Sequence, residues 1–338
     1  MDENGVMKLP ALLFSDTHFT SSPRDDYRWG LWDWLRDACC AQEVKTLVHL
    51  GDMTDAKDYH ASSLVNRIVD EVVKTSACVE DFYINLGNHD SLRRGHAFFS
   101  FLSHLPGVRF VTEPTELPDD GKGPAAFMLP HTKDPARDWA GFDLTHYDLL
   151  FMHQTVQGAR SSNGQVMRGE PLPWLQARKV WSGDIHVPQV VGGVEYVGSP
   201  YPVHFGDDFE PRCVLLDRRG RPSDLRFETI RRLSLRFLPG DDSALQHVRR
   251  GDQVKAVVEL AAHERHEWRR VQGEVMSMLN GMGADVVELR LAQAERKAPM
   301  GALDRPVAAL TDEEAMLAFV EANGLGVDAY EAGLGTMR

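Results

Sequence analysis

The sequence predicts a mixed α/β fold with a sheet inside and helices outside, followed by a small βαβ unit and a terminal helix. Short β-rich runs alternate with helical stripes from residue 10 to 105, which is the pattern of βαβ units. Residues 107–230 are mostly strand-like, and the pattern changes near Arg231. At roughly 150 residues per domain, 338 residues are enough for about two domains. We expect the first over 1–230 and the second over 231–298.

The β-rich runs of the first domain each stop in a polar cluster. They are ALLFS (11–15), TLVHL (46–50), FYINL (82–86), DLLFM (148–152) and RKVWS (178–182). Apolar residues at helical spacing predict helices over 26–41 and 60–77. In the first helix we expect Trp29, Trp32 and Trp34 to pack against the core, although the basic residues beside them would also suit stacking on an unpaired base.

The C-terminal part predicts a smaller unit and a separate helix. Strand-like runs at 252–260 and 285–291 flank a helical pattern over 264–282, which indicates a βαβ unit. The stretch 311–323 begins with Thr311 as a helix N-cap and ends before Gly324. An amphipathic helix after a linker favours docking, so 299–338 is predicted to be a linker and a partner-docking helix; covering its own domain is the alternative.

The composition excludes several classes of protein. Hydrophobic residues at 43% and charged residues at 26% exclude a disordered or fibrous chain. The net charge of −13 argues against a protein that mainly coats nucleic acid. The acidic N-terminus and the lack of an apolar run of about 20 residues predict a soluble, cytoplasmic protein without membrane contact. The four cysteines lack C-x-x-C spacing, so we expect reduced, mostly buried thiols.

Five strand ends carry side chains that bind metal ions. They are Ser15-Asp16-Thr17-His18, Gly51-Asp52, Gly87-Asn88-His89-Asp90, His153 and Gly183-Asp184-Ile185-His186. An Asp-x-His pair after a strand places both side chains on one side of the backbone, as two ligands of one ion require. The glycines of these motifs predict tight turns that keep the backbone clear of an ion or a phosphate.

The residue types indicate two metal ions. Asp, His and Asn together suit Mn²⁺, Fe or Zn²⁺ better than Ca²⁺ or a structural zinc. Seven candidate ligands are too many for one ion but fit two ions that share a carboxylate. Such a pair clamps both oxygens of an in-line phosphoryl displacement and generates hydroxide at neutral pH. We therefore expect hydrolysis of a phosphate ester with two divalent ions, Mn²⁺ first and Mg²⁺, Fe or Zn²⁺ as alternatives.

The ordered set D-x-H, G-D, G-N-H-D, a lone His and G-x-x-H resembles the motifs of the calcineurin-like metallophosphoesterases, and it covers about residues 10–210. The resemblance implies a four-layer α-β-β-α sandwich. The stretch from Tyr196 to Phe205 is similar to the G-S-P…F segment of the SbcD-type nucleases, whose partner is the ABC-type ATPase SbcC. It implies a homodimeric DNA exonuclease or endonuclease subunit that acts with an SbcC-like ATPase in DNA repair or recombination. The compact size fits a phage or prophage version of the family as well as a cellular one.

The resemblance also implies the role of each site residue. Seven would be metal ligands: Asp16, His18 and His186 at the first ion, Asn88, His153 and Asp184 at the second, and Asp52 bridging both. His89 would face the substrate and protonate the leaving alkoxide or stabilise the phosphorane, with Asp90 orienting its imidazole. The family has G-H-x-H where this chain has Asp184. A carboxylate there favours Mn²⁺ or Mg²⁺ and makes the water on the second ion less acidic.

Several residues near the motifs have a functional and a structural interpretation. Arg93, Arg94 and Ser199 are candidate contacts to a phosphate backbone, and a solvated helix start is the alternative for the arginines. Two further sets are interpreted as partners of the ligands or as structural residues. The first set would contact the ligands or cap the helix over 60–77, and it consists of Asp55, Asp58 and His60. Packing or surface residues are His49 and the histidines outside the motifs, among them His131 and His204.

Three functions are compatible with the sequence. The first is the metal-dependent DNA nuclease subunit. The second is a stand-alone phosphodiesterase or phosphatase on a small nucleotide, and the third is a weakly active DNA-end-binding scaffold in which Asp184 lowers the rate. The stretch 196–205 and the segment beyond 231 favour the first over the second, because an enzyme for small substrates needs no capping unit.

Overall fold

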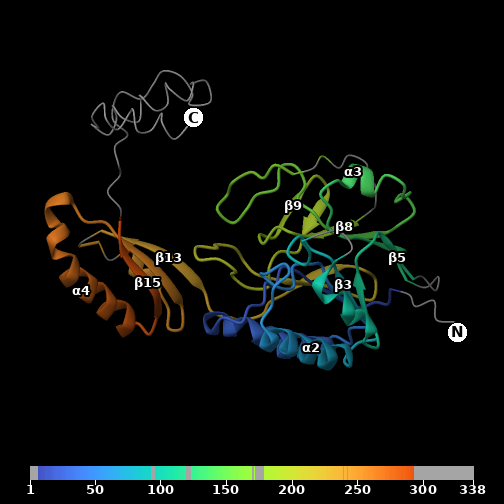
Figure 1. Cartoon of the computed structure of the whole chain (residues 1–338), viewed down its shortest axis with the longest axis horizontal. Helices are drawn as coiled ribbons and strands as arrows, with labels where there is room; N and C mark the ends of the chain where they lie inside the picture. The colour runs from blue at the N-terminus through green and yellow to red at the C-terminus, as the bar shows by residue number, and fades with distance from the viewer. Residues whose placement is uncertain are drawn as a thin grey trace, which may run out of the picture.

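The computed structural model describes residues 7–92, 96–118, 123–169, 171, 179–238, 240–241 and 243–292. Two six-stranded sheets form the body of the protein, and a three-stranded sheet with one long helix lies at one end of it (Figure 1). Arg93, Arg94 and the whole of 299–338, with its predicted docking helix, lie outside the described residues.

The first sheet has the strand order β12-β11-β1-β2-β3-β4. Its strands are β1 (Ala11–Phe14), β2 (Thr46–His49), β3 (Asp81–Asn85), β4 (Val108–Val111), β11 (Cys213–Leu216) and β12 (Pro222–Leu225). Strands β1 to β4 run parallel, whereas β11 and β12 pair antiparallel beyond β1. The strands predicted at 11–15, 46–50 and 82–86 are confirmed.

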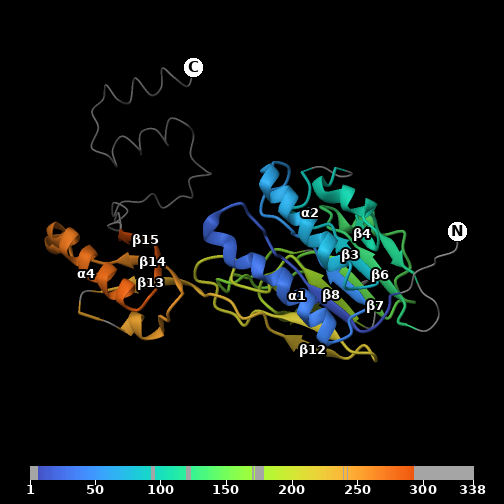
Figure 2. The same ribbon diagram turned by 90° about the horizontal axis from the view of Figure 1, so that it is seen from below.

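Helices cover the outer face of this sheet (Figure 2). They are the 3-10 helix η1 (Pro23–Trp29), α1 (Gly30–Ala41), α2 (Ser62–Ser76) and the 3-10 helix η2 (Phe98–His104). Helix α2 buries Leu64, Ile68 and Val72, which recur every four residues and therefore share one face. Trp29 and Trp32 are buried in the same core, so the packing interpretation of these tryptophans is confirmed.

The second sheet has the order β5-β6-β7-β8-β10-β9. Its strands are β5 (Thr115–Leu117), β6 (Ala126–Leu129), β7 (Leu149–His153), β8 (Lys179–Gly183), β9 (Gln189–Val191) and β10 (Val194–Tyr196). Strands β6, β7, β8 and β10 run parallel, and the two edge strands are antiparallel. The strands predicted at 148–152 and 178–182 are confirmed.

Three apolar layers hold the body together. Side chains of both sheets meet in the middle layer, where Leu13, Phe151 and Trp181 are fully buried. A second layer lies between the first sheet and its helices, and a third covers the outer face of the second sheet with the short helix α3 (Pro135–Asp138) and loops. This is the four-layer α-β-β-α arrangement that the sequence predicts, with the fourth layer built mainly from loops in the described part of the chain.

The third sheet is entirely parallel, with the order β13-β14-β15. Its elements are β13 (Arg232–Phe237), the 3-10 helix η3 (Ser243–His247), β14 (Gln253–Val258), the 3-10 helix η4 (Ala262–Glu267), α4 (Trp268–Gly281) and β15 (Asp285–Leu291). The βαβ unit predicted over 252–291 is confirmed, and β13 is a strand that the sequence analysis did not identify. Val254 and Leu279 belong to the separate apolar core of this unit. We call it the C-terminal sheet unit.

Two smaller expectations concern the cysteines and membranes. All four thiols are free, but only Cys39 and Cys213 are buried, so the expectation of mostly buried thiols holds for half of them. Across the described ranges, no helix has both the length and the apolar character that a bilayer crossing requires.

Neighbouring residues of α2 offer a test of this packing. Ile68 is fully buried under α2, whereas Val73 is 46% exposed on its other face. We expect Ile68→Ala to lower the free energy of unfolding by about 3 kcal/mol, because it removes buried methyl groups and leaves a cavity. Val73→Ala should change it by no more than about 0.5 kcal/mol. Urea unfolding followed by circular dichroism measures both, and equal losses would contradict the assigned face.

Candidate metal centre

The five motifs of the sequence meet where the two sheets of the body face each other. Strands β1, β2 and β3 are parallel, so their carboxyl ends place three of the turns along one edge of the first sheet. Strands β7 and β8 do the same in the second sheet. Residues far apart in the sequence thereby become neighbours.

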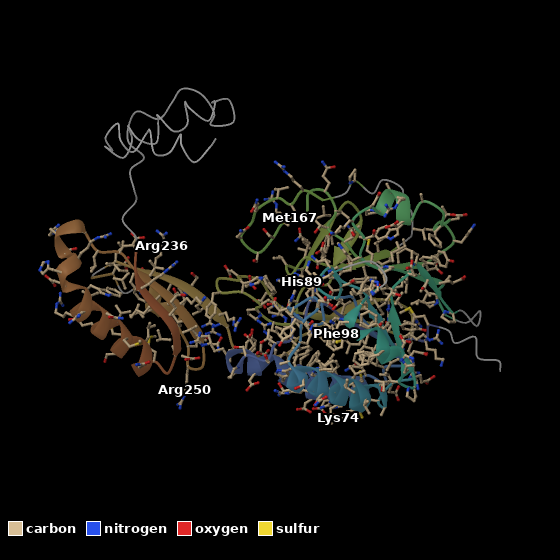
Figure 3. All side chains as sticks on the ribbon, viewed as in Figure 1. Lys74, His89, Phe98, Met167, Arg236 and Arg250 are labelled. Atoms are coloured by element: carbon tan, nitrogen blue, oxygen red, sulfur yellow. The ribbon has the colours of Figure 1, made fainter. Side chains whose placement is uncertain are left out.

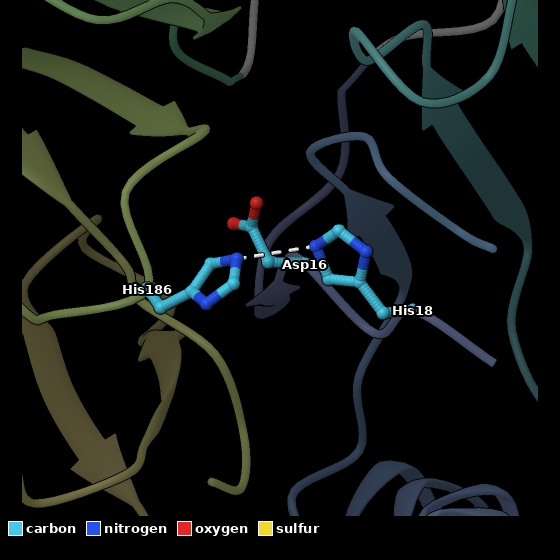
Figure 4. A group of neighbouring side chains, drawn as sticks. All are labelled: Asp16, His18 and His186. Carbon is cyan, nitrogen blue, oxygen red and sulfur yellow. Dashed lines mark hydrogen bonds between the residues drawn. The ribbon is translucent and has the colours of Figure 1, made fainter. Parts of the chain in front are cut away.

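Asp16, His18 and His186 form the first half of the centre (Figure 4). Their ligand atoms lie within 4.8 Å of one another, and the Nε2 atoms of the two imidazoles are 3.1 Å apart. Two nitrogen ligands that each lie about 2.1 Å from one ion are roughly 3 Å apart when they bind at right angles. The three side chains therefore fit a single metal ion.

Asp52 lies between this half and a second one around His153. One carboxylate oxygen, Oδ2, is 3.6 Å from His18 Nε2, and the other, Oδ1, is 3.4 Å from His153 Nε2. Asp184 Oδ1 lies 3.7 Å from the same His153 nitrogen. A carboxylate with one oxygen toward each half has the geometry of a bridging ligand.

Buried polar atoms without partners test whether metal ions fit. Asp16 Oδ2, Asn88 Oδ1 and His153 Nε2 are buried and accept or donate no hydrogen bond within the described ranges. A buried polar atom left unpaired costs about 1–3 kcal/mol, and the ligand atoms of Asp16 and His153 lie within 4.8 Å of each other, so this arrangement would be destabilising in a protein that binds nothing there. They are also the atoms that would bind metal, and the donor set fits divalent ions.

A hydrogen bond fixes the ring of His153 in the form that binds metal. Its Nδ1–H donates to the carbonyl oxygen of Leu50 at 2.7 Å, and a carbonyl can only accept. Nδ1 therefore keeps a proton, and Nε2 is the nitrogen that an ion would bind in place of its own proton. Leu50 directly follows β2, so this bond also joins the two sheets at the centre.

The electrostatics of the centre favour positive charge. Burial, together with the neighbouring Asp52, raises the pKa of Asp16 to about 6. Burial opposes the charged form of His153, but the attraction of Asp52, Asp16 and Asp184 outweighs it and holds the pKa of His153 well above its usual value. Burial and the nearby His18 lower the pKa of His186 to about 3, so that imidazole is neutral and ready to bind an ion.

The backbone at the centre adopts unusual conformations. Asp16, His18, Asp52 and Asp184 have φ angles of 53°, 43°, 60° and 83°, in the left-handed region that side chains other than glycine rarely adopt. Among the described non-glycine residues, only Glu43 shares this feature. Strain of this kind persists where the surrounding structure enforces it, and it often marks functional sites.

Glycines allow the turns to pack against one another. A Cβ atom on Gly87 would lie within 3.0 Å of Asp52, and one on Gly183 within 3.0 Å of His153 and Ser15. Gly51 has a φ of 109° and also abuts His153. The tight turn predicted for Gly51 is confirmed, but Gly87 and Gly183 are needed for close backbone approach and not for a positive φ.

His89 is half-buried at the mouth of the centre, near the middle of the body (Figure 3). Its backbone N–H donates to Asp52 Oδ1 at 2.8 Å, and its ring Nδ1–H donates to the Asp55 carbonyl at 2.7 Å. The ring centroid is 5.0 Å from that of His18. This arrangement leaves Nε2 of His89 for a substrate.

The predicted role of Asp90 is wrong. Its carboxylate accepts hydrogen bonds from the backbone N–H groups of Asp52, Met53 and Gly87 at 2.9, 3.1 and 2.7 Å. Asp90 therefore ties two ligand-bearing turns together, and the group that orients the His89 ring is the Asp55 carbonyl. All three donors are backbone groups, and two of them belong to a distant turn, so no local pattern predicts these contacts.

The prediction that Ser199 contacts a substrate is also wrong. Ser199 is fully buried, and its hydroxyl lies 3.1 Å from the carbonyl oxygen of Asp16 and 2.8 Å from that of Tyr201. The Tyr201 hydroxyl donates to the carbonyl of Thr17 at 2.5 Å. The segment 196–205 thus supports the Asp16–His18 turn from behind.

Other predictions for neighbouring residues are resolved by their contacts. Asp55 Oδ1 lies 3.6 Å from His18 Nδ1, which makes Asp55 a partner of a candidate ligand. The N-cap of α2 is Ala61, so none of Asp55, Asp58 and His60 caps that helix. His49 is a buried strand residue, as predicted, and lies 3.1 Å from the Thr17 hydroxyl.

Two histidines interpreted as surface or packing residues lie beside the centre. The His131 ring donates through Nδ1 to the His153 carbonyl at 3.2 Å. The His204 ring stacks on that of His186, with centroids 5.3 Å apart. Neither belongs to a recognisable motif. His204 lies within the 196–205 segment, which was the available signal for it.

Comparisons with known proteins agree with this geometry. A family model described as calcineurin-like phosphoesterase matches residues 9–188. Exonuclease subunit 1 of Enterobacteria phage T4 is 25% identical over 191 residues, which are 50% of this chain and 51% of that protein. The chain thus spans about half the length of this curated relative.

Two solved structures are similar at lower levels. The nuclease MPE of Pseudomonas putida has a TM-score of 0.32 at 15% identity, over 64% of this chain and 87% of that one. GAP50 of Plasmodium, described as the anchor in the inner membrane complex, has a TM-score of 0.40 at 13% identity, over 71% and 93%. The family match spans more than half of the sequence and includes all seven candidate ligands. The chain belongs to the calcineurin-like phosphoesterase family.

Proposed function

We propose that this phosphoesterase is a metal-dependent DNA nuclease subunit that binds two divalent ions and acts with an SbcC-like ATPase. The observation that carries the metal-dependent hydrolysis is the convergence of Asp16, Asp52 and His153, whose ligand atoms lie within 4.8 Å of one another and include buried atoms without partners. Mn²⁺ is the ion we favour, because the carboxylate of Asp184 adds a hard oxygen ligand to the set.

The residues at the centre have separate roles in metal binding and proton transfer. Divalent ions, when bound, supply Lewis-acid activation of water and of the phosphate. Asp16, His18 and His186 would hold one ion and Asn88, His153 and Asp184 the other, with Asp52 shared. His89 donates its Nδ1 proton to the Asp55 carbonyl, which aims Nε2 outward so that a protonated ring can give its Nε2 proton to the leaving oxygen.

A polynucleotide substrate is favoured over a small nucleotide by two observations. The C-terminal sheet unit packs directly on the segment beside the centre, since Arg232 donates to the Val203 carbonyl at 2.7 Å. The T4 relative is described as an exonuclease subunit, which implies a partner for that protein. By analogy we propose that this chain is a subunit that forms a homodimer and relies on an ATPase partner for much of its grip on DNA.

The substrate preference can be measured directly. We expect the purified chain to hydrolyse both single-stranded DNA and bis-nitrophenyl phosphate when Mn²⁺ is added, and neither after EDTA treatment. Fluorescent oligonucleotide cleavage and nitrophenol release follow the two reactions. Hydrolysis of the ester alone would contradict a nuclease and favour the small-nucleotide enzyme. DNA binding without hydrolysis of either substrate would favour the scaffold.

Two histidine variants separate proton transfer from metal binding. His89→Ala should lower turnover by about 10²–10⁴-fold while the chain keeps two Mn²⁺ ions, because the imidazole touches the substrate and not the ions. His153→Ala should lose an ion as well as activity. Metal content by inductively coupled plasma mass spectrometry decides between them, and loss of metal from His89→Ala would overturn its assignment.

Glycine variants test whether close packing of the turns builds the centre. Gly87→Ala should release Mn²⁺ and abolish hydrolysis, because the new methyl group collides with Asp52. Gly141→Ala is the matched control, since a Cβ atom there meets nothing within 4 Å. Calorimetric titration with Mn²⁺ measures both, and unchanged binding in Gly87→Ala would show that the turns are not constrained by this contact.

A further inference from the structure

A buried polar network joins the C-terminal sheet unit to the turn that carries His18. Its charged members are Asp25, Arg28 and Arg232, which are 9%, 3% and 7% exposed. Asp25 and Arg28 lie on η1, beside the body's first helix, whereas Arg232 begins β13. Charged side chains are rarely buried unless they are paired, so this cluster needs a structural or functional reason.

Arg28 holds the backbone of a candidate metal ligand. Its Nη1 donates to the carbonyl oxygen of His18 itself, and its Nη2 donates to the Val203 carbonyl at 3.2 Å. Its Nη2 also lies 3.3 Å from Asp25 Oδ1. The guanidinium therefore fixes the His18 turn against the segment 196–205. His18 has a φ of 43°, a conformation that persists only where its surroundings enforce it.

Arg232 brings the C-terminal sheet unit to the same acceptors. Its Nη1 donates to the Val203 carbonyl at 2.7 Å, and its Nη2 donates to Asp25 Oδ1. Its Nε donates to Gln253 Oε1 at 3.1 Å, and Gln253 Nε2 donates to the Arg24 carbonyl at 2.8 Å. The first residues of β13 and β14 are thus both anchored to η1.

The two arginines share their partners. Both guanidinium groups bind the Val203 carbonyl and Asp25 Oδ1, and Thr20 Oγ1 donates to the other Asp25 oxygen at 2.7 Å. One carboxylate is thus shared by two cations in a place with little water. If the Arg232 side chain moves away, Asp25 and the Val203 carbonyl lose one of their two cationic partners. They then attract Arg28 more strongly, and this pulls Arg28 away from the His18 carbonyl. Movement of one arginine therefore changes the contacts of the other.

We infer that Arg28 is a positioning residue for the first metal ion and that Arg232 makes its position depend on the C-terminal sheet unit. Displacement of that unit, for example by a protein bound to it, weakens the first ion's site and leaves the second intact. This inference rests on the metal centre of the proposed function. It adds that a segment which contributes no ligand controls how tightly the centre binds the first ion.

The test uses the full chain and a matched pair of arginines on one strand. Arg236 lies four residues beyond Arg232 on the same face of β13, but its side chain is 79% exposed and pairs with Glu259 (Figure 3). In calorimetric titration with Mn²⁺, Arg232→Met should weaken one of the two ions by roughly tenfold or more and leave the other unchanged, as loss of an outer-shell partner does. Arg236→Met should bind both ions as the wild type does.

Double variants identify which ion is affected. His186→Ala already removes a ligand of the first ion, so adding Arg232→Met should weaken Mn²⁺ binding no further. His153→Ala removes a ligand of the second ion, so adding Arg232→Met should weaken the ion that remains. The opposite pattern would overturn the inference, because it would assign Arg232 to the second site.

Folding and the metal centre itself are controlled separately. Asp25→Asn keeps the shape of the side chain and removes the charge that the two arginines share. It should therefore weaken the binding of one Mn²⁺ ion as Arg232→Met does, and it replaces Arg232→Met if that variant does not fold. Circular dichroism and thermal unfolding establish that each variant is folded. Folded Arg232→Met and Asp25→Asn chains that bind both ions normally would overturn the inference and leave the proposed function standing. A wild-type chain that binds no Mn²⁺ would overturn both.

Discussion

The hydrogen bond from His153 to the Leu50 carbonyl is the contact on which the candidate metal centre depends. It spans 2.7 Å between the end of β7 in one sheet and the residue after β2 in the other, so it joins the two sheets where the ligand turns meet. It also fixes the tautomer of a ligand. Glycines at 51, 87 and 183 allow the turns to approach this contact, and Asp90 ties two of them together through backbone amides. Without this packing, the ligands of the two sheets would remain apart.

Part of the negative charge of the chain is concentrated at this centre. Asp16, Asp52 and Asp184 are concentrated within a few ångströms of His153, where they raise its pKa. Burial makes this concentration costly, and divalent ions are the natural compensation. A net charge of −13 therefore does not argue against a phosphodiesterase, because part of the acidity builds the candidate metal centre. For the nuclease proposed above, this charge predicts that the isolated chain binds DNA weakly and only when metal is present.

The sequence was sufficient for the strands and the ligand motifs because both are local patterns. Apolar runs and the polar residues directly after them identify strand ends, and parallel strands bring those ends together. The errors concern contacts between distant segments. Asp90 and Ser199 look like site residues by position, yet their partners are backbone groups of other turns, and His131 and His204 approach the ligands from segments without a motif. The Arg232–Asp25 contact joins residues that are 207 positions apart in the sequence, and no local sequence pattern predicts it.

The two-ion centre is tested most directly by a crystal structure of the full chain soaked in Mn²⁺ and measured at the manganese absorption edge. We expect two anomalous peaks on either side of the Asp52 carboxylate. One should lie among Asp16, His18 and His186, and the other among Asn88, His153 and Asp184. A single peak, or two peaks that do not share Asp52, would contradict the two-ion centre, and so would manganese bound only elsewhere on the protein.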